Sequence, residues 1–194
     1  MNYEEALDKA EKVKMYLAPF CRRIEIAGSI RRKKQNEIKD IEIVAIPIFD
    51  FGVDVFGNAR KQTDPNQDLL SIRVHQLLSD GSFAHGDPDK AGKRAPCGHK
   101  YYRLKYDENN LDLFAVIPPA EWGTVFLIRT GDADFSHKFV TRLWKFGLRS
   151  VEGHIEDSTN KIIPTPEEKD AFELCHMNFI LPELRSAEVF KGFP

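Results

Sequence analysis

The stretch that decides the fold is Ala27–Pro47, AGSIRRKKQNEIKDIEIVAIP, which ends in an apolar strand with two acids near its start, Asp40 and Glu42. Successive side chains of a strand point to opposite faces, so the two acids share one face, which Val44 and Ile46 continue. Carboxylates this close repel each other when they are withdrawn from water, unless a cation lies between them. The pattern therefore fits either the solvated edge of a sheet or a metal site.

The composition bounds the class of protein. The chain has 194 residues, of which 42% are hydrophobic, and this is enough for one core or two small ones. Charged residues make up 30% of the chain, and the net charge is −2. A protein that binds nucleic acid through its overall field is more basic than this, so any site for a polyanion has to be local.

The sequence also indicates a compartment. Its three cysteines include no CxxC pair, which argues against a disulfide framework and against a thiolate zinc site. No apolar run is long enough to span a membrane, and residues 1–14, MNYEEALDKAEKVK, are too acidic and polar for a signal or transit peptide. We therefore expect a cytoplasmic protein with no membrane partner, and we expect it to be a monomer.

Helix and strand patterns predict an α+β fold with a small α+β domain toward the C-terminus. The expected helices are 3–18, 69–78, 121–128, 133–147 and 166–175, and the expected strands are 24–27, 41–48, 100–106 and 111–117. Residues 50–66 and 79–98 read as loops, and Pro166 is expected in the first turn of its helix. The pair Pro118-Pro119 marks the expected boundary between a first domain, 1–118, and a second, 119–194.

A third acid lies in a later apolar strand. Asp112 stands between Leu111 and Leu113, much as Asp40 and Glu42 stand among Ile and Val. If the two strands are neighbours in the sheet, the three carboxylates converge. Carboxylates, waters and substrate phosphates are the ligands that magnesium prefers, and two such ions can hold the attacking and leaving oxygens of a phosphoryl displacement.

The residues before the acid pair supply complementary chemistry. Gly28 allows backbone amides to approach a phosphate closely, and Ser29 adds a hydroxyl donor. Arg31 and Arg32 offer paired donors to phosphate oxygens. Alone, such a basic run is typical of a solvated surface turn. Followed by the acid pair, it favours a phosphate-binding turn beside a metal site.

Gly28-Ser29 followed by Asp-x-Glu between apolar residues resembles the nucleotidyltransferase signature, and the wider pattern is similar to the family X DNA polymerases, the group of DNA polymerase beta. GSIRR resembles their triphosphate-binding turn. LDLFAVIPPAEWGTVFLIRTGDADFSHKFV resembles their third catalytic strand, the helix after it and a Thr-Gly turn, and PTPEEKDAFE and ILPELR resemble their C-terminal subdomain. The resemblance covers residues 1–194, with a poor match over about 50–100. It implies an α/β palm, with a mixed sheet and flanking helices, plus a C-terminal subdomain. Members of this family often also carry an N-terminal lyase domain and helix-hairpin-helix elements, and because one helix is expected before the palm, we expect neither here.

The resemblance implies a role for each matching acid. Asp40 and Glu42 match the carboxylates that bridge two metal ions, and Asp112 matches the third acid, which helps to deprotonate the attacking 3′-hydroxyl. The implied cofactors are two Mg²⁺ ions, for which Mn²⁺ can substitute. The implied reaction takes a nucleoside triphosphate, adds dNMP to the 3′-hydroxyl of a DNA primer–template or gapped DNA, and releases pyrophosphate, as in DNA repair.

The resemblance also implies contacts to the nucleotide. Gly28, Ser29 and Arg32 match the triphosphate-binding turn, and Thr130 with Gly131 matches the turn beside the incoming sugar.

Three positions depart from the family. Glu42 stands where the polymerases usually carry Asp, Ile128-Arg129 replaces an aromatic pair beside the sugar, and Ser136 replaces an asparagine. Ile128 does not fill the volume of a ring, so we expect weaker selection against ribonucleotides.

Four basic residues, Lys138, Arg142, Lys145 and Arg149, recur at steps of four, three and four after Asp134. On one continuous helix they form a stripe, and the resemblance places this helix against DNA. The same stripe is otherwise typical of a solvated helix face.

Two other functions fit the same observations. A nucleotidyltransferase that acts on RNA or on a small molecule, such as one that adenylylates antibiotics, would share the carboxylates. The small-molecule enzyme would also need an acceptor pocket and a general base. A nucleic-acid-binding module without catalysis would have no need of three intact acids. Residues 80–99 fit either a template clamp or a flexible loop.

Overall fold

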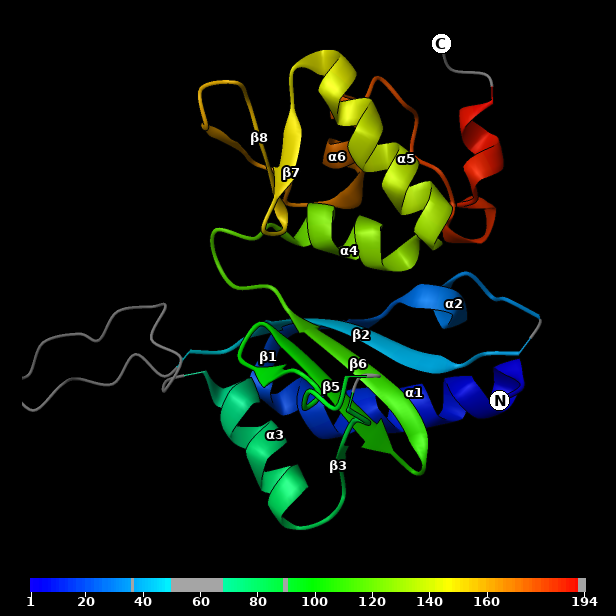
Figure 1. The fold of residues 1–194 in the computed structure, drawn as a ribbon, viewed down its shortest axis with the longest axis vertical. Coiled ribbons are helices and arrows are strands. Elements are labelled where there is room, and N and C mark those ends of the chain that lie inside the picture. The colour runs from blue at the N-terminus through cyan, green and yellow to red at the C-terminus, as the bar shows by residue number, and fades with distance from the viewer. Residues whose placement is uncertain (36, 50–67, 89–90, 192–194) are drawn as a thin grey trace, which may run out of the picture.

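The computed structural model describes residues 1–194 except 36, 50–67, 89–90 and 192–194. The protein is mixed α+β, with a six-stranded mixed sheet, flanking helices and a small three-stranded antiparallel sheet (Figure 1). The predicted α+β class is therefore confirmed at this level. The strands of the larger sheet are β1 (Cys21–Ile26), β2 (Asp40–Pro47), β3 (Ala84–His85), β4 (Cys97–Gly98), β5 (Tyr101–Tyr106) and β6 (Asn109–Ala115).

The strand order places the two acid-bearing strands side by side. The order is β1-β2-β6-β5-β3, and β4 pairs with β5. β2 and β6 run parallel to each other, and the other neighbouring pairs are antiparallel. β6 is therefore inserted between β2 and β5.

One face of the larger sheet carries the main apolar core. Two helices, α1 (Tyr3–Leu17) and α3 (Leu69–Ser79), cover this face (Figure 1). The sheet contributes Ile41, Ile43 and Leu111, which are fully buried. These residues alternate with the acids along their strands, so the core lies on the face opposite to the acids.

The acid face is itself apolar beyond the acids. There Val44 and Phe114 pack against Trp122 and Phe126 of α4 (Trp122–Thr130). α4 lies between the larger sheet and the remaining C-terminal elements (Figure 1). The apolar part of the face is therefore buried under a helix, and the acids lie next to this covered area.

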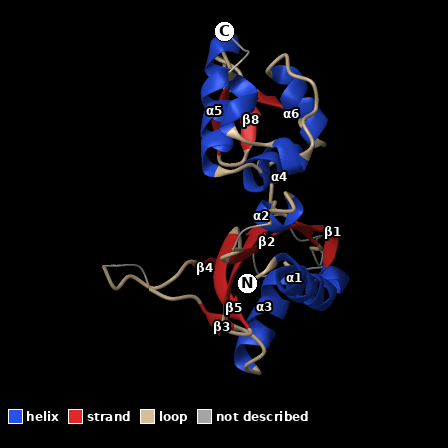
Figure 2. Cartoon of the chain, turned by 90° about the vertical axis from the view of Figure 1, so that its right-hand side faces the viewer, coloured by secondary structure: helices blue, strands red, loops and turns tan. Residues whose placement is uncertain are grey.

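The C-terminal part has its own apolar core. The rings of Phe135, Phe139 and Phe172 are fully buried, with centroids 5.6 to 6.4 Å apart. α5, α6 and β8 gather around this core (Figure 2). The elements here are α5 (Ala133–Leu143), η3 (Trp144–Phe146), β7 (Arg149–Val151), β8 (His154–Glu156), β9 (Ile162–Ile163), α6 (Glu168–Leu174), η4 (Pro182–Leu184) and η5 (Ala187–Phe190).

The helix predicted over 133–147 is shorter than expected. The α-helix ends at Leu143 and continues as the single 3-10 turn η3, after which Gly147 has a left-handed backbone with φ 70°. The chain then turns into β7, which begins at Arg149. The prediction that Arg149 continues the helical stripe is therefore wrong.

Other boundaries shift as well. Pro166 precedes Glu167, the N-cap of α6, so it does not lie in the first turn of the helix as predicted. The loop expected over 79–98 contains the two-residue strands β3 and β4. The loop predicted over 50–66 lies outside the described residues. Within the described ranges, no helix has the length and apolar character needed to cross a membrane.

Candidate active site

The parallel pairing of β2 with β6 brings the three predicted acids to one place. Glu42 lies directly opposite Asp112, and Asp40 lies opposite Asn110, one pleat further along the same face. Neighbouring strands are about 4.8 Å apart, so side chains at these positions are within reach of each other. The two strands are thus neighbours, as the convergence of the acids requires.

Asp112 is buried, with 8% of its surface exposed, and it accepts hydrogen bonds from two side chains of β5. The Tyr101 hydroxyl donates to Asp112 Oδ1 at 2.8 Å, and Arg103 Nε donates to the same oxygen at 3.3 Å. Burial, followed by the bond to Asp112, raises the pKa of Tyr101 to about 12, so the phenol remains a donor at neutral pH.

The other two acids have different surroundings. Asn110 Nδ2 donates to Asp40 Oδ1 at 2.9 Å. Glu42 is half-buried, and no residue in the described ranges donates a hydrogen bond to its carboxylate. Burial raises the pKa of Glu42 to about 7; the charge of Arg32 opposes this rise, and the negative charges of Asp112 and Asp40 add to it.

As the side chains lie, the described part of the chain contains no group of three or more His, Cys, Asp or Glu residues that could hold a metal ion. Two of the three acids are engaged by internal donors, Asp40 by Asn110 and Asp112 by Tyr101 and Arg103. The backbone therefore places three carboxylates, which are hard oxygen ligands, on one face. Two of these carboxylates accept hydrogen bonds from neighbouring side chains.

The short helix α2 (Gly28–Arg31) lies against this acid face. Gly28 has φ 59°, and a Cβ atom there would lie 1.7 Å from Glu42 Oε2, so the approach requires glycine. Arg32 follows the helix, and its charge acts on Glu42. Ser29 is half-buried in the same turn. The residues predicted to bind a triphosphate are thus next to the acids.

Thr130 joins the two predicted nucleotide-binding segments. Arg31 Nη1 donates to Thr130 Oγ1 at 2.6 Å, and Arg32 Nη1 donates to the Thr130 carbonyl at 2.5 Å. Thr130 is fully buried at the end of α4. At Gly131, a Cβ atom would lie 2.3 Å from Phe135 Cδ1, so glycine lets α5 begin close to the end of α4.

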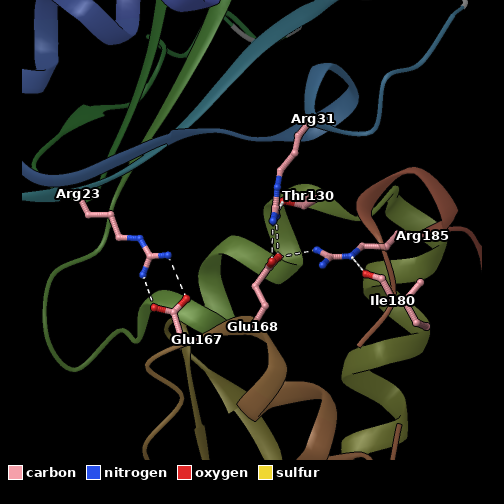
Figure 3. Close-up of polar contacts among 7 residues, drawn as sticks. All are labelled: Arg23, Arg31, Thr130, Glu167, Glu168, Ile180 and Arg185. Atoms are coloured by element: carbon pink, nitrogen blue, oxygen red, sulfur yellow. Dashed lines mark hydrogen bonds and ion pairs between the residues drawn. The ribbon is translucent and has the colours of Figure 1, made fainter. Parts of the chain in front are cut away.

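Sequence reasoning missed the buried acid Glu168, which lies between Arg31 and Arg185 (Figure 3). Arg31 donates to both carboxylate oxygens at 2.7 Å, and Arg185 Nη1 donates to Oε1 at 2.5 Å. Burial acts to raise the pKa of Glu168, but hydrogen bonds from the two guanidinium groups outweigh it and the pKa is lowered. Beside this network, Arg23 forms a paired contact with Glu167 at 2.6 and 3.0 Å.

Three of the four basic residues predicted to contact DNA donate hydrogen bonds to groups within the C-terminal part. Lys138 Nζ and Arg142 Nε donate to backbone carbonyls at 3.4 and 3.0 Å. Arg149 Nε donates to the buried Glu156 at 2.5 Å, and Lys145 lies in η3. The four charged residues therefore lie on three elements, α5, η3 and β7, and do not share one helix face.

A cavity of about 470 Å³ opens beside the acids. Its walls include Tyr101, Phe114, Ile128 and Arg129. The Tyr101 ring stacks on Phe114 with centroids 4.8 Å apart, and the Arg129 guanidinium lies 3.9 Å from the centroid of the same Phe114 ring. Because Tyr101 also donates to Asp112, the cavity borders the acid cluster.

No protein-family model matches this sequence, and no curated protein matches it. The residues of the site therefore carry the functional proposal.

Proposed function

We propose that this chain is a metal-dependent nucleotidyltransferase with a polymerase-type palm at 1–118 and a C-terminal subdomain at 119–194. It joins dNMP from a dNTP to the 3′-hydroxyl of DNA and releases pyrophosphate, as a small family X polymerase would. One observation carries the proposal: Glu42 and Asp112 face each other on parallel strands, with Asp40 on the same face and Gly28 packed against Glu42.

The chemistry of the acid cluster suits Mg²⁺. All three side chains are carboxylates, the hard oxygen ligands that Mg²⁺ and Mn²⁺ prefer. The pKa of Glu42 is raised to about 7, mainly by burial. Neighbouring groups therefore do not fully offset the negative charge of the ionised carboxylate, and a bound cation would supply the missing positive charge. Rotation of Asp40 away from Asn110, and release of Asp112 from one of its two donors, would complete the ligand set. When bound, two Mg²⁺ ions would activate the attacking hydroxyl and stabilise the charge on the transferred phosphate.

Each polar residue then has a defined task. Asp40 and Glu42 would hold both ions, and Asp112 would hold the ion next to the 3′-hydroxyl and help to remove its proton. The new bond forms between the 3′-oxygen and the α-phosphorus, while the bond from the α-phosphorus to the bridging oxygen breaks and pyrophosphate leaves. Ser29 and Arg32 would donate hydrogen bonds to the triphosphate.

The remaining contacts concern the sugar and the acceptor strand. Thr130 and Gly131 would lie beside the sugar of the incoming nucleotide. Lys138, Arg142 and Lys145 are the proposed contacts to DNA phosphates. Arg149 is left out of this set, because its guanidinium is already paired with Glu156.

A second candidate is a nucleotidyltransferase that acts on a small molecule. The cavity beside the acids favours it, because small-molecule sites are concave, largely apolar and of about this size. Tyr101 and Phe114 would form the apolar wall, and Arg129 would contribute the charged group.

Nucleotide incorporation on a panel of acceptors separates the two candidates. The wild-type chain is incubated with dNTPs and Mg²⁺ or Mn²⁺ on single-stranded, recessed and gapped DNA, and in parallel with ATP and a set of small hydroxyl acceptors. We expect extension of at least one DNA substrate with release of pyrophosphate. Transfer to small acceptors without extension of DNA would overturn the polymerase proposal and support the second candidate.

A further inference from the structure

Asp112 is held by two donors that converge on one of its oxygens. Tyr101 and Arg103 both come from β5, and Arg103 lies directly opposite Asp112 in the antiparallel register. Both donate to Oδ1 of the buried carboxylate, at 2.8 and 3.3 Å. Whether Asp112 Oδ1 is available to a metal ion therefore depends on two residues that are not themselves proposed metal ligands.

The two donors are held with very different firmness. The Tyr101 ring is stacked on Phe114 with 4° between the ring planes, and this fixes the position of its hydroxyl. The Arg103 side chain is 46% exposed and reaches Asp112 only through Nε, at the longer distance. A long and half-exposed arginine can leave this contact by rotating into solvent, whereas the stacked tyrosine cannot.

The charges of the two donors also differ. Tyr101 is neutral and can stay hydrogen-bonded to a carboxylate that coordinates a metal ion. Arg103 carries a full positive charge beside the same oxygen, and Asp112 stabilises that charge. A divalent cation among Asp112, Glu42 and Asp40 would be repelled by it. The guanidinium and the metal ion therefore compete for Asp112.

We propose that Arg103 occupies the Asp112 carboxylate in the metal-free protein and is displaced when a divalent cation binds, while Tyr101 stays in place as the positioning residue. This inference rests on the proposed function, since it concerns the same three acids. It accounts for the present arrangement, in which the backbone places the acids together but no metal-binding group of side chains is formed within the described ranges.

Arg103→Gln tests the competition through direct metal binding. Mn²⁺ is titrated into the 194-residue chain, without nucleotide or DNA, and free Mn²⁺ is followed by electron paramagnetic resonance. We expect Arg103→Gln to bind Mn²⁺ about tenfold more tightly than wild type, the order expected when one unit charge acts on a divalent ion about 6 Å away in water-like surroundings. Arg103→Lys keeps the charge and should bind much as wild type does.

The matched control is Lys105→Gln. Lys105 lies two residues along β5 on the same face and is paired with Asp87 at 2.8 Å. Its loss removes the same charge from the same strand, and we expect a change of about twofold or less, because the charge lies further from the acids. Circular dichroism checks that each variant is folded, and Arg103→Met provides a second neutral variant that keeps the aliphatic stem.

The outcomes distinguish this inference from the proposed function. Mn²⁺ binding that Asp112→Asn removes, and that tightens in Arg103→Gln and Arg103→Met but not in Lys105→Gln, supports the exchange. The same Asp112-dependent binding with unchanged affinity in both Arg103 variants overturns the exchange and leaves the metal site standing. Wild-type protein that shows no Asp112-dependent Mn²⁺ binding overturns both.

Discussion

Glu168 and the cluster of Asp40, Glu42 and Asp112 differ in how the charge of their carboxylates is balanced. Glu168 is enclosed by Arg31 and Arg185, both of which donate to it, and its pKa is lowered. Glu42 is surrounded by two other acids, receives no hydrogen bond on its carboxylate from the described residues, and has a pKa raised to about 7. A balanced buried acid is typical of a structural contact, whereas a poorly balanced cluster is typical of a functional site. Four predictions test this division of roles.

Asp112→Asn gives the largest expected effect. The change removes a proposed metal ligand while it preserves the shape of the side chain, so nucleotide incorporation should fall about 10⁴-fold, equivalent to about 5.5 kcal/mol of transition-state stabilisation. Binding of the triphosphate should change little, because Ser29 and Arg32 are intact. Single-turnover incorporation measures the rate, and nucleotide titration measures the binding.

The control for this prediction is Asp107→Asn. Asp107 is an exposed acid in the turn between β5 and β6, paired with Lys9 at 2.8 Å and outside the cluster. It should incorporate nucleotides at the wild-type rate. If Asp112→Asn also retained that rate, the cluster would have no catalytic role and the contrast between the two groups of acids would lose its functional meaning.

Glu168→Gln should lower the stability of the fold, whereas Asp112→Asn should lower catalytic activity. Arg185 is 1% exposed, so loss of the charge at Glu168 leaves a buried guanidinium without its counter-charge. Breaking a buried pair in this way costs about 4 kcal/mol, which should appear as a lower free energy of unfolding in urea. The exposed pair of Arg23 with Glu167 offers a comparison, because Glu167→Gln should cost about 1 kcal/mol or less. Equal losses in the two variants would contradict a special role for Glu168.

Glu42 should make the metal-free protein less stable as the pH rises. Its folded-state pKa is about 7 against an ordinary value of 4.5, so the native state binds the proton more tightly than the unfolded state does. The resulting stability is fully present below pH 4.5 and is lost as the pH rises through about 7. The loss amounts to about 3 kcal/mol, from about 2.5 pH units at 1.36 kcal/mol each.

The measurement is urea unfolding in the presence of EDTA across this pH range. Glu42→Gln has no charge to develop, so it should match wild type at pH 4.5 and be the more stable protein at pH 8. Added Mg²⁺ should narrow the gap at pH 8, because a bound cation would offset the charge of the wild-type cluster. A constant difference between the two proteins at every pH would show that Glu42 does not titrate in this way.

The sequence predicted the parts of the site that depend on local pattern. Alternation along β2 and β6 was enough to place Asp40, Glu42 and Asp112 on strands. The turn predicted at Gly28-Ser29 is instead the start of the short helix α2. The register that sets Glu42 opposite Asp112 was not predictable, because it depends on a parallel pairing between segments 70 residues apart, which no local periodicity encodes.

The Glu168 network was missed for the same kind of reason. Arg31 and Glu168 are 137 residues apart in the sequence. In addition, an acid in the first turn of a helix is usually solvated and interacts favourably with the helix dipole, so it does not suggest a buried ion pair. The helix end was misjudged for a local reason. Gly147 correctly predicted where the helical segment ends. The last turn before it is a 3-10 turn, however, and the sequence pattern does not distinguish such a turn from α-helix.

The smallest effect should come from Arg129, the weakest counter-charge at Glu42. Arg32 opposes the raised pKa of Glu42 more strongly than Arg129 does, and Arg129 lies over Phe114 with its side chain exposed. Each guanidinium favours the charged form of the carboxyl group, so replacing either one should raise the pKa of Glu42 further. Arg32→Gln should therefore move the Glu42 titration upward by the larger amount, and Arg129→Gln should move it upward only slightly. Carbon NMR of the labelled Glu42 carboxyl, titrated without metal, reports the pKa directly. A shift in Arg129→Gln as large as that in Arg32→Gln would mean that Arg129 is a principal partner of the cluster, and that the acids are balanced more like Glu168 than the contrast between the two groups requires.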